Sequence, residues 1–260
     1  MTNIHPTAIV DPKAEIGKNC LIGPYCIIGP EVKLGDENIL VSNVVIDGIT
    51  TTGYRNKFFH SAVIGSDCQD LKYKGEPTKL MIGDNNTFRE FCTVNRSATM
   101  DEPTRIGNNC LLMAYTHVAH NCILGNKLIL ANAVNLAGHV HIHDNVTIGG
   151  MTAINQFVKI GVYAFVGGKS GLKKDIPPFT RGGGMPYQII GLNTIGLQRK
   201  DFSDDSIKAI KDIYKIFYKS GLNVSQALKK AEEISDLTKE QRIFFNFVKN
   251  SERGISKYSY

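Results

Sequence analysis

Large aliphatic residues recur at every sixth position over most of this chain. Steps of six from Ile4 to Leu172 give 29 positions, of which 26 are apolar; the exceptions are Thr52, Asp70 and Glu76. A helix has a side-chain period of 3.6 residues and a strand a period of two, so neither maintains a period of six over this distance. A six-residue unit with one large aliphatic side chain fits a short strand followed by a corner.

Three such units close a triangular coil, and stacked coils pair their strands in parallel at about 4.8 Å. The aliphatic residues then fill the lumen. Glycine often follows the aliphatic residue, which suits a corner that needs a positive φ or a close approach of two backbones. The pattern predicts a mainly β protein, a left-handed parallel β-helix of hexapeptide repeats over residues 1–180.

Two segments interrupt the repeat. The polar segment Gln69–Pro77 lacks repeat chemistry, and a shorter break precedes Ile106. We predict loop insertions near 69–81 and 100–105. Because loops on a rigid scaffold often carry function, the longer insertion is a candidate part of a site.

The last quarter of the chain has a different composition. Residues 201–260 hold only two of the 25 glycines. Ser203 can cap a helix that ends near Gly221, Asn223 or Ser225 can start a second one, and Thr238 with Gln241 resembles a capping box. We predict a connector and a C-terminal helical domain over residues 181–260.

Composition narrows the classes of function. No apolar run is long enough for a membrane span, and the N-terminus does not resemble a secretory signal, so we expect a cytoplasmic protein. All six cysteines occupy the fifth position of a hexad, which predicts small buried side chains rather than disulfides or metal ligands. The net charge of +6 lies entirely in residues 159–200, where seven basic residues accompany one acid. Such a stretch is a solvated face or a site for an anionic partner.

Five of the seven histidines lie between positions 117 and 143. With 18 residues per coil, His120, Gly138 and Gln156 should stack in one column, with His139 beside them. A neutral imidazole next to an exposed backbone N–H suits acyl transfer, because it can deprotonate a hydroxyl while the N–H stabilises an oxyanion. Two alternatives remain open: ordinary surface histidines, and a metal site formed by His117, His120 and His139.

Several segments together resemble the UDP-N-acetylglucosamine O-acyltransferase family, which performs the first acylation of lipid A synthesis. They are Gln69–Pro77, His117–Cys122, Leu136–Val140, Ile148–Thr152 and Gly196–Ser203. The resemblance implies a homotrimer with active sites between subunits. It also implies transfer of an (R)-3-hydroxyacyl group from acyl carrier protein to the glucosamine 3-hydroxyl of the UDP-sugar. The donor brings its own phosphopantetheine, so we expect no further cofactor and no metal.

The resemblance also implies roles for individual residues. His120 matches the general base and Gly138 the oxyanion donor. The implied substrate contacts are Gln69, Asp70, Lys72, His117, His139, Asn155, Gln156, Gly168, Asn193, Arg199 and Lys200. Among these, Gly168 matches the small residue that leaves room for the acyl chain, and Asn193, Arg199 and Lys200 match a grip on UDP. The basic stretch then becomes a docking surface for acidic substrates rather than for nucleic acid.

Three positions differ from the family pattern. Asn121 stands where well-known members have Asp, Asn155 where the family often has His, and Ile195 where some members have an acidic residue. They keep alternatives open: transfer to a 3-amino UDP-sugar, a metal-dependent hexapeptide hydratase, or a non-catalytic trimeric scaffold. A related N-acyltransferase of the same pathway is less favoured, because it usually has an extra N-terminal domain.

Overall fold

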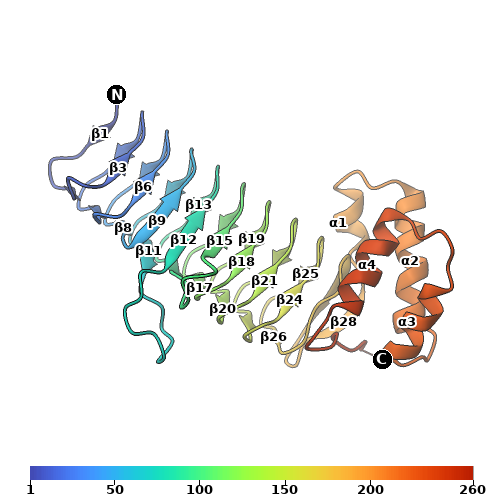
Figure 1. The fold of residues 1–260 in the computed structure, drawn as a ribbon. Helices are drawn as coiled ribbons and strands as arrows, with labels where there is room; N and C mark the ends of the chain where they lie inside the picture. The colour runs from blue at the N-terminus through green and yellow to red at the C-terminus, as the bar shows by residue number, and fades with distance from the viewer. Residues whose placement is uncertain (260) are drawn as a thin grey trace.

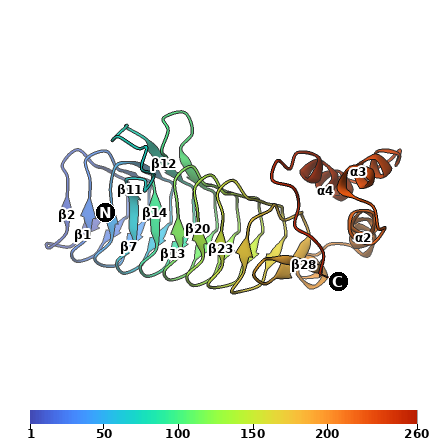
Figure 2. The ribbon, with the colours of Figure 1, turned by 90° about the horizontal axis from the view of Figure 1, so that it is seen from below.

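The repeat folds as a prism of three parallel sheets. The computed structural model describes residues 1–259, which contain 28 β-strands and four α-helices. In Figure 1 the coils stack from the N-terminus toward the helices at the other end, and Figure 2 shows the same prism from below. The predicted left-handed parallel β-helix is confirmed, with one antiparallel pair, β27 and β28, at its C-terminal end.

We call the three sheets S1, S2 and S3. S1 contains β1 (Asn3–Ile4), β4 (Leu21–Ile22), β7 (Ile39–Leu40), β10 (Lys57–Phe58), β13 (Thr87–Phe88), β16 (Leu111–Leu112), β19 (Ile129–Leu130), β22 (Thr147–Ile148), β25 (Phe165–Val166), β27 (Thr180–Gly183) and β28 (Gln188–Leu192). S2 contains β2 (Ile9–Val10), β5 (Ile27–Ile28), β8 (Val45–Ile46), β11 (Val63–Ser66), β14 (Thr93–Asn95), β17 (His117–Val118), β20 (Asn135–Leu136), β23 (Ala153–Ile154) and β26 (Gly171–Leu172). S3 contains β3 (Glu15–Ile16), β6 (Lys33–Leu34), β9 (Ile49–Thr52), β12 (Lys79–Ile82), β15 (Thr104–Ile106), β18 (Ile123–Leu124), β21 (His141–Ile142) and β24 (Lys159–Ile160).

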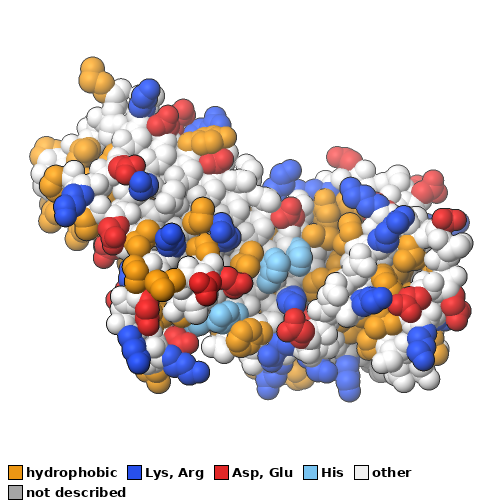
Figure 3. Space-filling model, viewed as in Figure 1, with side chains coloured by type: hydrophobic (Ala, Val, Ile, Leu, Met, Phe, Trp, Pro, Cys, Tyr) orange, Lys and Arg blue, Asp and Glu red, His pale blue; other side chains and the backbone are white. Residues whose placement is uncertain are grey.

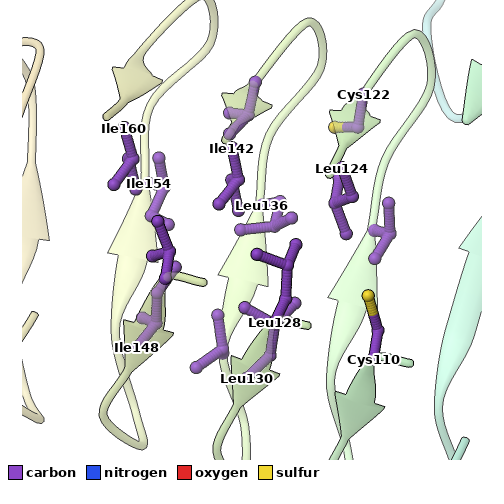
Figure 4. Packing of buried hydrophobic residues seen from close by; sticks show 14 of the residues in the cluster. Cys110, Cys122, Leu124, Leu128, Leu130, Leu136, Ile142, Ile148, Ile154 and Ile160 are labelled. Carbon is purple, nitrogen blue, oxygen red and sulfur yellow. The ribbon is translucent and has the colours of Figure 1, made fainter. Parts of the chain in front are cut away.

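The first residue of each hexad fills the lumen. Leu124, Ile142 and Ile160 pair in register on successive coils of S3 and point inward together (Figure 4). Each is almost fully buried. Burial of one such side chain stabilises the fold by about 1.5–3 kcal/mol. The other strand residue points outward, which leaves every second strand position available for chemistry.

Of the two reasons predicted for glycine at the corners, a positive φ and a close approach of two backbones, the structure supports mainly the second. Positive φ occurs at the fourth position of the hexads, as in Asn19 (φ 56°) and Asn109 (φ 58°). Glycine at the second position instead allows the coils to approach closely: a Cβ on Gly23 would lie 1.8 Å from the carbonyl oxygen of Val41 on the next coil. Close backbone approach, and not a left-handed φ, is therefore the main requirement at this position.

Both interruptions of the repeat lie at the corner between S2 and S3. The first separates β11 from β12, and the second separates β14 from β15. In Figure 2 the two loops leave the same edge of the prism. Consequently, the two insertions stand next to the coils that carry the clustered histidines.

The C-terminal segment forms α1 (Thr194–Gln198), α2 (Asp204–Tyr218), α3 (Val224–Glu232) and α4 (Lys239–Lys249). Ser203 caps α2 as predicted, Asn223 caps α3, and Thr238 with Gln241 forms the predicted capping box of α4. The segment predicted as a connector contains β27 and β28, which extend S1 before the first helix. The boundary near residue 180 stays a prediction. Within residues 1–259, no helix is both long and apolar enough to cross a membrane.

Candidate active site

A cavity of about 1040 Å³ opens on S2 and on its corner with S3. Its lining comes from the first insertion, from three successive coils and from the C-terminal tail. The lining residues are Gln69, Asp70, Leu71, Lys72, His117, Ala119, His120, Asn135, Leu136, Ala137, Gly138, Ala153, Ile154, Asn155, Gln156, Phe157 and Arg253. Figure 3 shows histidine side chains over the middle of the prism.

His120 lines this cavity and is only 5% exposed. The coils on either side of it are in register, since His139 N–H donates to the His120 carbonyl (3.0 Å) and Phe157 N–H to the Gly138 carbonyl (3.2 Å). His120, Gly138 and Gln156 therefore lie one above the other on successive coils. The spacing of the repeat alone was sufficient to predict this column.

Asn121 determines which ring nitrogen of His120 carries the proton. The Asn121 Oδ1 accepts from the Ala98 backbone N–H (2.9 Å), and its Nδ2 donates to the Glu102 carbonyl (3.1 Å). A flipped amide would place donor against donor and acceptor against acceptor, so these two backbone groups fix its orientation. His120 Nδ1 lies 3.0 Å from Oδ1. Hence Nδ1–H is the donor, and Nε2 keeps its lone pair.

Gly138 lies directly against the imidazole. A Cβ at this position would be 2.5 Å from His120 Nε2, a distance that side-chain atoms do not tolerate. Within the described residues, the Gly138 N–H has no hydrogen-bond acceptor. A free backbone donor beside a basic nitrogen is the arrangement that stabilises a developing oxyanion.

Two further histidines flank His120. His117 Nδ1 lies 2.7 Å from the Thr93 hydroxyl, and the His139 ring meets the His120 ring edge-on at 5.2 Å and stacks on Phe157 at 4.7 Å. Burial lowers the pKa of both His117 and His139, and the neighbouring His120 lowers each further. Both rings are therefore neutral at pH 7 and can donate or accept hydrogen bonds without a competing positive charge.

Arg96 ties the first insertion to the β-helix. Its side chain is 13% exposed and forms an ion pair with Asp67. Its guanidinium also donates to the Gly65 carbonyl (2.8 Å) and to the Tyr73 hydroxyl (3.0 Å). This anchor holds the loop that brings Gln69, Asp70 and Lys72 to the cavity, and within that loop the Asp70 carboxylate accepts from the Lys72 backbone N–H at 2.9 Å.

A second cavity of about 560 Å³ lies on S1, between the prism and α1. Its lining includes Asn193, Arg199 and Lys200, together with Arg181. Asn193 is partly engaged, because its amide donates to the Tyr163 carbonyl (2.9 Å) and caps α1. The predicted site residues thus fall into two groups on different sheets of one chain. Two predicted residues line neither cavity: Gly168 lies exposed at the S1–S2 corner, and His139 contacts the site through the His120 ring.

Comparisons with known proteins give a consistent result. A model of the UDP-N-acetylglucosamine O-acyltransferase domain 2 matches residues 175–256, and a model of bacterial transferase hexapeptide repeats matches residues 2–48 and 103–138. The solved UDP-N-acetylglucosamine O-acyltransferase of Moraxella catarrhalis is 40% identical, with 98% of this chain and 99% of that chain covered and a TM-score of 0.93. The chain belongs to the UDP-N-acetylglucosamine O-acyltransferase family.

Other members agree over the same length. The UDP-N-acetylglucosamine acyltransferase of Bacteroides fragilis is 40% identical over 98% of this chain and 100% of its own, with a TM-score of 0.94. That of Campylobacter jejuni is 34% identical over 99% and 100%, with a TM-score of 0.92. The family resemblance inferred from the motifs is therefore confirmed.

Several residues that line the cavity around His120 were not predicted from the sequence. Asn135 is the outward residue of β20, and the strand alternation could have placed it beside His117, with which it pairs in register. Arg253 gave no signal, because nothing in its local sequence shows that the tail returns to the prism. Within residues 1–259, no group of three or more His, Cys, Asp or Glu side chains is placed to hold a metal ion.

Proposed function

We propose that this chain transfers an (R)-3-hydroxyacyl group from acyl carrier protein to the glucosamine 3-hydroxyl of UDP-N-acetylglucosamine, the first step of lipid A biosynthesis. The proposal rests on one observation: His120 Nε2, which keeps its lone pair, and the Gly138 N–H, which has no acceptor, lie side by side in one cavity. Family membership supplies the acceptor, since the related structures are named for acyl transfer to UDP-N-acetylglucosamine.

The geometry supports a direct transfer. His120 Nε2 takes the proton of the 3-hydroxyl as its oxygen attacks the thioester carbonyl. The Gly138 N–H stabilises the negative charge on the carbonyl oxygen. When the tetrahedral intermediate collapses, the C–S bond breaks and the imidazolium returns its proton to the leaving thiolate. Asn121 accepts from Nδ1–H throughout, so the ring keeps its orientation.

The donor brings the phosphopantetheine group, and no other cofactor is needed. The basic excess supports an acidic donor protein, since Lys173 and Lys174 are exposed where β26 ends. Long-range attraction of this kind weakens with added salt. We expect charge reversal at Lys173 or Lys174 to raise the KM for acyl carrier protein and to reduce the salt dependence of the rate. Such an enzyme works in the cytoplasm, where nucleotide sugars and acyl carrier proteins are made.

A homotrimer would bring the two cavities together. In one chain the cavity on S2 and the cavity on S1 lie on different sheets, so a neighbouring copy has to supply the second half of a shared site. The S1–S2 corner also carries exposed apolar side chains: Tyr25, Phe91, Tyr115 and Met151 are each 48–65% exposed. Light scattering at assay concentration would test the assembly, with a monomer contradicting it.

One feature favours a second acceptor. Asn121 is a neutral amide, which supports the imidazolium less than a carboxylate would. An amine is the better nucleophile and needs less help from the base, so a UDP-sugar with a 3-amino group is the alternative acceptor. Nothing in the described residues supports the hydratase alternative, and one metal analysis of purified protein tests it: stoichiometric zinc would revive it.

The decisive assay identifies the reaction product by mass spectrometry. Purified protein is mixed with a panel of (R)-3-hydroxyacyl carrier proteins and either UDP-N-acetylglucosamine or its 3-amino analogue. We expect a 3-O-acyl product from the first sugar. An amide formed much faster from the second would transfer the proposal to the amino sugar, and no product from either would overturn it.

A further inference from the structure

Arg253 reaches the catalytic cavity from the far end of the chain. It lies in the tail that follows α4, and it lines the cavity together with His120 and Gly138. Its side chain is exposed, and its Nε donates to the Lys173 carbonyl at 3.2 Å. Within residues 1–259, the two Nη groups have neither a hydrogen-bond acceptor nor a carboxylate partner. The fork of the guanidinium is therefore available to a ligand.

A buried carboxylate fixes the tail that carries Arg253. Asp175 is 0% exposed, and its carboxylate accepts from the Ser251 hydroxyl (2.6 Å) and the Lys159 backbone N–H (2.8 Å). The tail also pairs with its backbone, through Asp175 N–H to Gly254 O (3.0 Å) and Ser256 N–H to Asp175 O (2.8 Å). A buried charge without these partners is costly, so the tail is held firmly on either side of Arg253.

The height of Arg253 along the prism matches a specific ligand. Arg253 contacts Lys173, whose corner lies three coils beyond that of His120, or about 14 Å at about 4.8 Å per coil. A phosphopantetheine arm has about thirteen bonds between its sulfur and its phosphorus, and an extended chain of that many bonds spans roughly 15 Å. A thioester held at His120 therefore places its phosphodiester at the level of Arg253.

The surroundings of Arg253 favour an anion. Lys173, Lys174 and Lys257 are exposed nearby, and the adjacent Glu252 is paired with Lys159 at 3.2 Å. Figure 3 shows Lys and Arg side chains gathered beyond the lower ends of β26 and β28. A guanidinium matches a phosphate geometrically, because it can donate two parallel hydrogen bonds.

We propose that Arg253 binds the phosphodiester of the donor's phosphopantetheine arm, with the Asp175-anchored tail as its support. The proposal rests on the acyl carrier protein donor of the proposed function. It assigns the C-terminal tail a direct part in donor recognition. Lys173 and Lys174 then act at longer range, on the carrier protein itself.

The test compares two donors in two proteins. The donors are (R)-3-hydroxyacyl-phosphopantetheine and the same thioester on pantetheine, which lacks the phosphate. In the wild-type protein we expect kcat/KM to be about tenfold higher for the phosphorylated donor, because a charge-assisted hydrogen bond is worth about that much. In Arg253→Ala the preference should disappear, and Arg253→Lys should restore part of it.

The controls separate failure of this proposal from failure of the proposed function. Lys230→Ala, an exposed cation in α3, should leave the donor preference unchanged. An active wild-type protein whose preference survives in Arg253→Ala would overturn the Arg253 assignment alone. A rise in KM for the UDP-sugar, with an unchanged donor preference, would overturn it in favour of a pyrophosphate contact. No turnover in the wild-type protein would instead reject the function. Thermal unfolding of each variant checks that the tail remains docked.

Discussion

Two histidine clusters lie close together on the same β-helix, yet their surroundings differ. In the first, His117 and His120 line the cavity of about 1040 Å³, and His139 contacts the His120 ring. The second, His141 and His143, lies on S3 beneath α4 and lines a cavity of about 420 Å³. Both clusters arise from the same repeat, so they show what a histidine needs in addition to its position.

The second cluster is packed rather than oriented for proton transfer. The two rings stack at 4.3 Å, and His143 meets Phe247 of α4 edge-on at 5.9 Å. Burial, with smaller contributions from His143 and Lys159, lowers the pKa of His141 to about 4. In the described residues, neither ring has a hydrogen-bonding side chain comparable to Asn121. A proton acceptor needs a fixed tautomer, and among these five histidines of the described residues His120 has both a tautomer fixed by Asn121 and an unpaired backbone N–H, that of Gly138, beside it.

The largest difference between the two clusters is expected when one histidine of each is replaced by alanine. His120→Ala removes the proposed base, so we expect kcat to fall by about 10³-fold. His143→Ala removes packing against His141 and α4 and should leave kcat nearly unchanged. Product formation from UDP-N-acetylglucosamine measures both. A similar rate loss in the two variants would show that the clusters do not differ as proposed.

The next largest effect is expected at Gly138. Gly138→Ala would place a Cβ 2.5 Å from the His120 ring, which displaces the base and alters the oxyanion donor. We expect kcat to fall about 10²-fold with little change in folding. Gly183→Ala is the matched control, since its Cβ would have an ordinary contact of 3.6 Å with the Ser170 hydroxyl. An active Gly138→Ala enzyme would remove this residue from the mechanism.

Substitutions of Asn121 distinguish its effect on the orientation of the His120 ring from the effect of a negative charge at this position. Asn121→Ala loses the acceptor of His120 Nδ1–H, a hydrogen bond worth about 1–2 kcal/mol, so kcat should fall about tenfold while KM changes little. Asn121→Asp keeps this acceptor but cannot donate to Thr99 Oγ1 or the Glu102 carbonyl. It should therefore retain more activity than Asn121→Ala and unfold at a lower temperature. Equal kcat in all three proteins would contradict the orienting role.

The sequence could predict the fold because one simple period controls it. The six-residue repeat determines which residue of each strand enters the lumen, and 18 residues per coil place His120 below Gly138. The caps of α2 and α4 could also be predicted, because each depends only on residues within one turn of helix. These predictions depend on local sequence and a fixed period, so they need no information about contacts between distant segments.

What the sequence could not predict depends on contacts between distant segments. Arg253 reaches the cavity because Asp175 binds the tail, a pairing between segments far apart in the chain. The partners of Asn121 lie in the second insertion, whose path no periodicity describes. The sequence therefore placed His120 and Gly138 side by side in one cavity, and their roles as base and oxyanion donor stay a prediction. The groups that orient them, and the cation at the cavity mouth, required the folded structure.

The smallest expected effect concerns His141 and His143, and it is seen in the free energy of unfolding and not in the reaction rate. The folded-state pKa of His141, about 4, lies below its ordinary value of 6.5. Between these values the unfolded chain binds a proton at this residue that the folded chain does not, so the free energy of unfolding should fall as the pH drops from 6.5 to 4 and level off below that. Allowing for partial exposure, the loss is about 2 kcal/mol. Denaturant unfolding across this range should show a smaller loss in His141→Gln. His5→Gln, an exposed control, should follow the wild-type curve, and an unaltered pH dependence in His141→Gln would show that another group is responsible.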